Sequence, residues 1–167
     1  MTQPLHYPDE TLRGILSQVR TIAMVGASGD WKRPSFFAMK YLQRRGFRVI
    51  PVNPGRAGSE ILGETVYAAL ADIPGDIDMV DVFRSSEAAL GVAEDAAALA
   101  EDKQIKIFWL QLGIRNDDAA EIARAVGMTV IMDRCPKIEF ARLSGELSWS
   151  GINSKIITSK ILRMPRI

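Results

Sequence analysis

Short apolar runs alternate along the chain with longer segments whose apolar residues recur at helical spacing. The spacing predicts helices over residues 9–20, 34–46, 86–101, 117–126 and 136–143, with a shorter one over 67–73. The apolar runs predict strands over residues 21–26, 47–53, 78–83, 105–110 and 128–132, with a loop at 54–66. Strands separated by helices are typical of a parallel sheet covered on both faces. The pattern therefore predicts an α/β fold, a doubly wound parallel five-stranded sheet.

Prolines and glycines place several of the expected boundaries. Pro34 suits the first turn of a helix, and Gly46 suits the position just past its end. Pro51 cannot donate a ladder hydrogen bond, so it should lie late in its strand or in a strand at the edge of the sheet. In a doubly wound sheet ligands bind outside the carboxyl ends of the strands, so functional residues are sought directly after each strand.

Length, composition and charge describe one ordinary folded domain. The chain has 167 residues, 47% of them hydrophobic and 25% charged, and a formal net charge of +1. So balanced a charge disfavours nucleic acid as a partner. No apolar run reaches the ~18 residues of a membrane span, and residues 1–4 do not resemble a secretory signal. A cytoplasmic protein is expected, with no membrane partner; association into a homo-oligomer stays open.

The cysteine and histidine counts exclude further classes. Cys135 is the single cysteine and His6 the single histidine, so neither an internal disulfide nor a cysteine- and histidine-rich zinc site is expected. A histidine-activated nucleophile would have to use His6, and its neighbours do not suggest a catalytic base. Hydrolase chemistry of that kind is disfavoured, and no metal site is expected.

The loop after the first strand is the strongest local signal for a phosphate ligand. It runs from Gly26 into the helix that begins at Pro34, and backbone N–H groups at such a place attract anions. The dinucleotide pattern G-x-G-x-x-G is incomplete, because Ser28 and Trp31 stand at its second and third glycine positions. The second strand ends in Asn53 where NAD enzymes place an acid. A plain strand-to-helix turn remains the alternative interpretation.

A cation follows every expected strand within a few residues. These cations are Lys32 and Arg33, Arg56, Arg84, Arg115, and Arg134 with Lys137. Together they suggest an anionic ligand, and Lys32, Arg33 and Arg56 suggest one with more phosphate than NAD carries. Acidic residues are interleaved with them, so solvated loop charge explains the pattern equally well.

Five motifs, taken together and in this order, are more specific than any one of them. They are Val25-Gly26-Ala27-Ser28 with Arg33-Pro34-Ser35, Pro51-Val52-Asn53-Pro54, Val82-Phe83-Arg84, Trp109-Leu110-Gln111-Leu112-Gly113 and Asp133-Arg134-Cys135-Pro136-Lys137. Over about residues 9–143 the chain resembles the small single-domain CoA-binding proteins, relatives of the CoA-binding domain of the succinyl-CoA synthetase α subunit. The resemblance implies a Rossmann-like domain, residues 1–143, that binds coenzyme A.

The resemblance also implies a set of ligand-binding residues. Those expected at the phosphates are Gly26, Ala27, Ser28, Lys32, Arg33, Pro34 and Ser35. Those expected at the far side of the nucleotide are Asn53, Pro54 and Arg56, with Phe83 and Arg84 beside the pantetheine or adenine. The catalytic histidine that the synthetases carry in another domain has no match here, so ligase activity is not expected.

Three further residues admit two interpretations each. Trp109 is expected in the core rather than stacked on a ligand. The Gln111 amide could donate to a ligand or satisfy a loop carbonyl, and it is counted as a candidate ligand-binding residue. Cys135 precedes a helix and lies beside cations, which would lower a thiol pKa, whereas the alternative is a small buried residue.

The leading hypothesis is a protein that binds CoA or acyl-CoA without catalysis, as a carrier, sensor or regulatory subunit. The alternatives are a thiol-dependent redox or acyl-transfer enzyme that uses Cys135, and an NAD(P)-binding oxidoreductase or sensor. Residues 144–167 are expected to form a C-terminal extension packed on the domain or on a partner.

Overall fold

A five-stranded parallel sheet forms the centre of the computed structural model, which describes residues 5–145. The strand order is β2-β1-β5-β6-β7. The strands are β1 (Thr21–Val25), β2 (Arg48–Val52), β5 (Met79–Val82), β6 (Ile107–Leu110) and β7 (Thr129–Ile131). The helices are α1 (Asp9–Gln18), α2 (Pro34–Arg44), α3 (Ser86–Leu99), α4 (Asp117–Ala125) and α5 (Pro136–Leu143). The predicted doubly wound α/β fold is confirmed.

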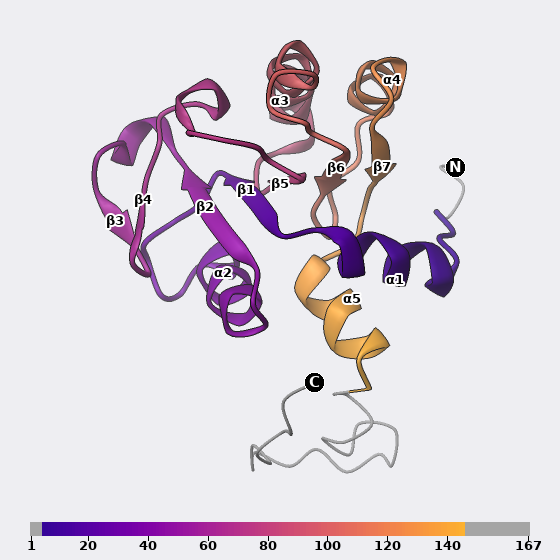
Figure 1. The fold of residues 1–167 in the computed structure, drawn as a ribbon, viewed down its shortest axis with the longest axis horizontal. Coiled ribbons are helices and arrows are strands. Elements are labelled where there is room, and N and C mark those ends of the chain that lie inside the picture. The colour runs from indigo at the N-terminus through magenta and orange to yellow at the C-terminus, as the bar shows by residue number, and fades with distance from the viewer. Residues whose placement is uncertain (1–4, 146–167) are drawn as a thin grey trace.

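The helices form two layers, one on each face of the sheet (Figure 1). Helices α3 and α4 cover one face, and α1, α2 and α5 cover the other. Alternate residues of a strand contact opposite layers, as Val49 and Ile50 of β2 do. All four residues of β5 and all four of β6 are buried. Apolar side chains on both faces explain why these strands read as continuous apolar runs.

Small side chains let α3 lie close to the sheet. Ala89, Ala93 and Ala96 are spaced along one face of the helix and are fully buried. On α4, Ala119, Ala120 and Ala123 pack in the same way. On the opposite face Trp109 is fully buried, and its Nε1 donates to the carbonyl oxygen of Arg134 at 2.8 Å. The prediction that Trp109 belongs to the core is therefore confirmed.

The segment after β2 differs from the sequence prediction. Residues 54–66 contain a 3₁₀ turn, η1 (Pro54–Arg56), and an antiparallel pair, β3 (Glu60–Ile61) with β4 (Glu64–Thr65). The helix expected over 67–73 is only a 3₁₀ turn, η2 (Leu70–Asp72). Tyr67 instead pairs with the edge strand β2, donating its N–H to Pro51 O at 3.0 Å and accepting from Asn53 N at 2.9 Å. Tertiary pairing with the exposed strand edge thus overrides the local helical tendency.

Two smaller expectations concern the ends of elements. Pro51 lies near the end of β2, which is an edge strand of the sheet, as its missing N–H required. The first helix ends at Gln18, two residues early, because Val19 already has an extended backbone conformation. Of the expected C-terminal extension, residues 146–167 lie outside the described residues.

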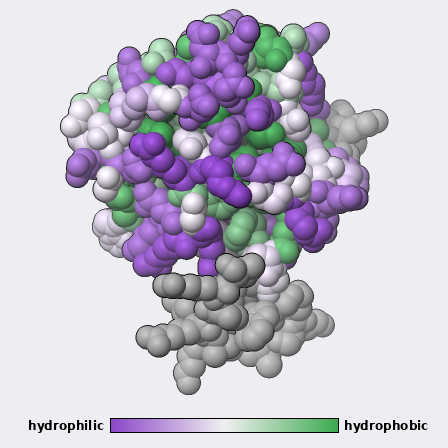
Figure 2. Space-filling view, viewed as in Figure 1, coloured by the Kyte–Doolittle hydropathy of each residue, from purple (hydrophilic) through white to green (hydrophobic). Residues whose placement is uncertain are grey.

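The surface drawn in Figure 2 is mainly hydrophilic, with hydrophobic residues between the polar ones. Large exposed apolar side chains within residues 5–145 are Trp31, Phe37, Leu112, Val126 and Ile138. None of the helices in this range is long and apolar enough to cross a bilayer. Since Phe37, Leu112 and Ile138 line one pocket, their exposure is concentrated rather than scattered.

The strand order reverses between β1 and β5, and Gly26 lies at this point. The chain leaves β1 for β2 on one side, whereas the later strands add on the other side. Gly26 follows β1 with φ +85°, donates its N–H to Val52 O at 2.9 Å, and lies against the backbone after β5. A Cβ built on Gly26 would lie 2.3 Å from Phe83 O. Only glycine fits both the conformation and the space.

Gly26→Ala is expected to lower the free energy of unfolding by at least about 2 kcal/mol, because the side chain adds left-handed strain to a backbone clash. Gly91→Ala is the matched control, since a Cβ there meets nothing within 4 Å inside α3. Alanine should raise stability at that position by about 0.5–1 kcal/mol. Urea denaturation of the three proteins measures both effects, and equal stability of Gly26→Ala and the parent would contradict the close approach.

Candidate functional site

A pocket of about 900 Å³ opens at the carboxyl edge of the sheet, at the point where the strand order reverses. This volume is at the upper end of the range typical of small-molecule sites. The residues that line it come from the loops after β1, β2, β5, β6 and β7 and from α2 and α5. They are Gly26, Ala27, Ser28, Lys32, Arg33, Pro34, Ser35, Phe37, Ala38, Asn53, Phe83, Arg84, Ser85, Gln111, Leu112, Ile114, Cys135, Lys137 and Ile138.

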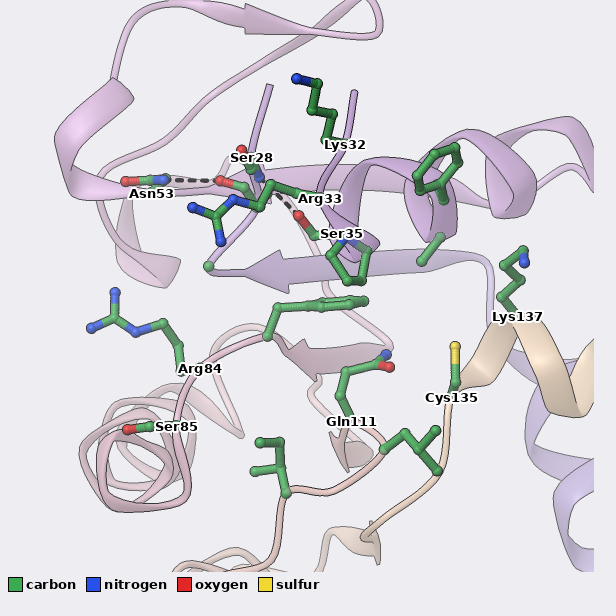
Figure 3. A pocket seen from close by; sticks show the side chains of 18 of the residues that line it. Ser28, Lys32, Arg33, Ser35, Asn53, Arg84, Ser85, Gln111, Cys135 and Lys137 are labelled. Carbon is green, nitrogen blue, oxygen red and sulfur yellow. Dashed lines mark hydrogen bonds between the residues drawn. The ribbon is translucent and has the colours of Figure 1, made fainter. Parts of the chain in front are cut away.

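The pocket has two ends (Figure 3). Asn53 and Arg84 lie at one end, with Ser28, Arg33 and Ser35 above the middle. Cys135 and Lys137 lie at the other end, and Gln111 lies between them. An elongated ligand with a polar group at one end would fit this arrangement.

The loop after β1 is held in shape by its own hydroxyl groups. Ser28 N donates to Ser35 Oγ at 3.1 Å, and Asp30 N donates to Ser28 Oγ at 3.1 Å. Ser35 is buried at the start of α2. No side chain caps α2. Pro34 has no N–H and Phe36 N donates to Arg33 O at 3.1 Å, so in the described part of the chain the Ser35 N–H is the first-turn donor left without a partner. The loop thus presents the positive end of a helix to the pocket.

Asn53 joins the loops that follow the first two strands. Its Nδ2 donates to Ala27 O at 2.9 Å, and its Oδ1 accepts from Gly55 N at 3.0 Å. The side chain therefore needs both a donor and an acceptor, which an aspartate does not offer. This connection places Asn53 in the pocket wall as a positioning residue.

Four cations line the pocket without an ion pair in the part of the chain that the structure describes. They are Lys32, Arg33, Arg84 and Lys137, and the pocket lining includes no carboxylate. Lys32 and Lys137 lie over the rings of Trp31 and Tyr41, with Nζ 5.5 and 5.7 Å from the ring centroids. Uncompensated positive charge around a concave surface attracts anions.

The other cations that follow the strands, Arg56, Arg115 and Arg134, do not line the pocket. Arg115 pairs with Asp117 at 3.1 Å, and Arg134 lies 3.8 Å from Glu139. The Arg134 guanidinium also donates to Leu5 O at 2.9 Å, so it holds the N-terminal segment. Of the predicted ligand-binding residues, Pro54 and Arg56 do not line this pocket. The solvated or structural interpretation therefore holds for Arg115 and Arg134.

Gln111 is buried at the floor of the pocket, with 6% of its surface exposed. Its Nε2 donates to Asp81 Oδ1 at 2.7 Å. This partner is a carboxylate rather than the loop carbonyl that the sequence suggested, and contact with a ligand stays a prediction. Asp81 lies in the middle of β5 and is fully buried.

Cys135 lines the pocket as the residue before α5. Burial raises the pKa of its thiol, and the nearby charge of Asp81 raises this pKa further. The N–H groups of Ile138 and Lys137 lower the pKa only in part. The expectation of a lowered thiol pKa is therefore wrong, because desolvation outweighs the helix N-terminus and the cations.

Several lining residues have no motif that points to them. Phe37, Ala38 and Ile138 are helix residues whose direction depends on how α2 and α5 pack. Ile114 lies in the loop after β6, and Ser85 caps α3 by accepting from Ala88 N. One signal was available for Asp81, since an aspartate inside an apolar strand is unusual.

Comparison with known proteins shows the family. Residues 20–141 match the model of the CoA binding domain, and the chain belongs to this family. The resemblance to small single-domain CoA-binding proteins is confirmed.

Individual relatives agree with this assignment. The chain is 38% identical over 130 residues to the uncharacterized protein YneT of Bacillus subtilis, covering 78% of this chain and 92% of the relative. It is 35% identical, with a TM-score of 0.78, to a solved hypothetical protein from Pyrococcus horikoshii, covering 87% and 99% of the two chains. The dinucleotide-forming acetyl-coenzyme A synthetase 1 of Ca. Korarchaeum cryptofilum, solved with phosphate and ADP, is 26% identical. That match has a TM-score of 0.55 and covers 66% of this chain and 25% of the synthetase.

Proposed function

We propose that the protein binds coenzyme A or an acyl-CoA in the pocket at the carboxyl edge of the sheet. The observation that carries the proposal is a set of cations, Lys32, Arg33, Arg84 and Lys137, that have no ion pair within residues 5–145 and lie in a pocket lining without carboxylates. CoA is a phosphate-rich, elongated molecule with a thiol at its far end. Membership of the CoA binding domain family supports the same ligand.

The phosphates of the nucleotide lie at the first turn of α2 and between Arg33 and Arg84. The loop glycine lets the backbone approach them, and the Ser35 N–H at the start of α2 donates to them. Arg56 lies outside the pocket lining, with a guanidinium nitrogen 3.6 Å from a Cβ built on Gly29. From there it contributes long-range positive charge rather than a direct contact.

The pantetheine arm extends from Phe83 over Gln111 toward Cys135. This end of the pocket is more apolar, with Leu112, Ile114 and Ile138 in its wall. An amphipathic arm that ends in a thiol or a short thioester suits such a wall. The role we propose is non-catalytic: carrier, sensor or regulatory subunit. A cytoplasmic location and a homo-oligomer remain predictions.

CoA is expected to bind more tightly than NAD or NADP. Ser28 and Trp31 replace two glycines of the dinucleotide pattern, and the amide of Asn53 is engaged with Ala27 and Gly55 instead of a ribose. Titration calorimetry with the three ligands decides the order of affinity. Mass spectrometry of small molecules released from the purified protein supplies an independent check. Tighter binding of NAD than of CoA would overturn the proposal.

Arg33→Ala is expected to weaken CoA binding by about 1–3 kcal/mol, because a charge-assisted contact to phosphate is lost. The melting temperature of the free protein should hardly change, since Arg33 is exposed and forms no ion pair within residues 5–145. Added salt should reduce the difference between the parent and the variant.

The matched control for Arg33→Ala is Arg124→Ala, which removes an exposed arginine of α4 outside the pocket. Its affinity for CoA should equal that of the parent. An equal effect of both substitutions would show that only net charge matters and that Arg33 does not contact the ligand.

A second function, favoured by the position of Cys135 at the thiol end of the pocket, is thiol–disulfide exchange with CoA disulfide. The Cys135 thiolate attacks one sulfur of the disulfide, forming a mixed disulfide, and a CoA thiolate leaves. CoA disulfide is the oxidant: the Cys135 thiol is oxidised to the mixed disulfide, and one half of the CoA disulfide is reduced to CoA.

The rate of mixed-disulfide formation is expected to rise with pH well above neutrality. The pKa of Cys135 is raised, so the thiol is protonated at pH 7 and its reactive fraction grows only as the pH approaches that raised value. Intact-protein mass spectrometry after incubation with CoA disulfide measures the adduct, which reductant should remove. Cys135→Ser should give no adduct. If the parent also gives none while CoA still binds, the thiol function falls and the binding function stands.

A further inference from the structure

Asp81 carries a buried oxygen that no group in the described part of the chain satisfies. Its Oδ1 accepts from Gln111 Nε2 at 2.7 Å, whereas Oδ2 has no hydrogen-bond partner among residues 5–145. The side chain is fully buried in the central strand β5. A buried carboxyl with one unpaired oxygen is destabilising. Its presence in the middle of an apolar strand therefore indicates a role other than stabilising the fold.

The surroundings of Asp81 contain few groups that titrate. Its register neighbours are Met24 on β1 and Trp109 on β6, and neither carries a charge. Directly before α5 lies the Cys135 thiol, whose pKa the charge of Asp81 helps to raise. Other charged groups on the elements around the pocket are Lys32, Arg33, Arg84 and Lys137, which line it, and Glu139, which is bound to Arg142.

Burial raises the pKa of Asp81 to about 7, and the hydrogen bond from Gln111 lowers it in part. None of the pocket cations is among the causes of this shift. With a pKa of about 7, the carboxyl changes its protonation state near neutral pH, and its hydrogen-bond partner is Gln111.

The contact between Asp81 and Gln111 determines which end of the Gln111 amide faces the pocket. An ionised carboxylate only accepts hydrogen bonds, so Gln111 must turn its NH₂ group toward Asp81. Its carbonyl oxygen is then left for a ligand in the pocket. Gln111 lines this pocket between Arg84 at one end and Cys135 at the other (Figure 3). An apolar neighbour in place of Asp81 would leave the amide free to rotate.

We propose that Asp81 is a positioning residue that orients the Gln111 amide so that its carbonyl oxygen accepts an N–H group from the arm of the ligand. The ligand chemistry is a secondary amide between the phosphates and the thiol, as in pantetheine. This inference rests on the proposed binding of CoA and adds the group that recognises the arm rather than the nucleotide.

The proposal predicts a pH dependence of definite sign. Protonated Asp81 can donate to Gln111 Oε1, which would turn the NH₂ group into the pocket and remove the acceptor that the ligand uses. The complex therefore favours ionised Asp81, so its pKa falls on binding and a proton is released near pH 7. CoA affinity should rise between pH 6 and 8, by up to about tenfold if the pKa falls by one unit.

The experiment compares two ligands by calorimetry between pH 6 and 8. CoA reaches Gln111, whereas adenosine 3′,5′-bisphosphate carries adenosine phosphates without the arm. With the parent protein, CoA affinity should rise with pH more steeply than affinity for the bisphosphate. In Asp81→Asn the two pH profiles should become parallel, and CoA should lose affinity while the bisphosphate keeps it.

The control Asp102→Asn removes an exposed carboxylate and should leave both profiles as in the parent. If Asp81→Asn does not fold, Gln111→Leu serves instead, since it removes the amide that connects the Asp81 carboxyl to the ligand. In this variant, CoA affinity should rise with pH no more steeply than affinity for the bisphosphate. Three results would each overturn the inference. They are parallel pH profiles of the two ligands in the parent, proton uptake instead of release on CoA binding, and a CoA profile in Asp81→Asn that is still steeper than that of the bisphosphate. If neither ligand binds, the proposed function falls as well.

Discussion

The close approach of the chain after β1 to the chain after β5 determines where this protein has a pocket. Gly26 lies where the strand order reverses, and the carbonyl of Phe83 occupies the space that a side chain would need. The two loops then diverge, one into α2 and the other into α3. The gap between diverging loops is what makes the carboxyl edge concave at this point.

The walls of the pocket are supported by hydrogen bonds between loops rather than by the strands themselves. Asn53 connects the loop after β2 to the loop after β1, and Ser35 holds Ser28 from the start of α2. Because these contacts use side-chain groups, they fix the loops and leave the Ser35 N–H at the start of α2 without a partner among the described residues. The cations that remain unpaired around this framework give the pocket its positive charge.

A buried carboxyl beneath a pocket that attracts anions is electrostatically unfavourable, and the position of Asp81 limits that cost. Asp81 does not line the pocket, and it contacts Gln111, which does. Its negative charge raises the pKa of the nearby Cys135 thiol, after the larger effect of burial. The same carboxyl thus explains the orientation of Gln111 and adds to the larger effect of burial on the pKa of the Cys135 thiol.

The sequence by itself determined the main elements and the family. Apolar runs located all five strands of the sheet, because these strands are buried on both faces. Helical spacing of apolar residues located the five helices, because each helix buries one face. Glycine at 26 and the motif order indicated the binding edge and the family. What only the tertiary structure decided depends on partners distant in the chain. The pairing of Tyr67 with β2, the division of the cations into paired and unpaired sets, and the desolvation that raises the pKa of Cys135 all arise from such contacts. Local sequence does not encode which acid reaches which cation or how deeply a thiol is buried, because both follow from the packing of the whole domain.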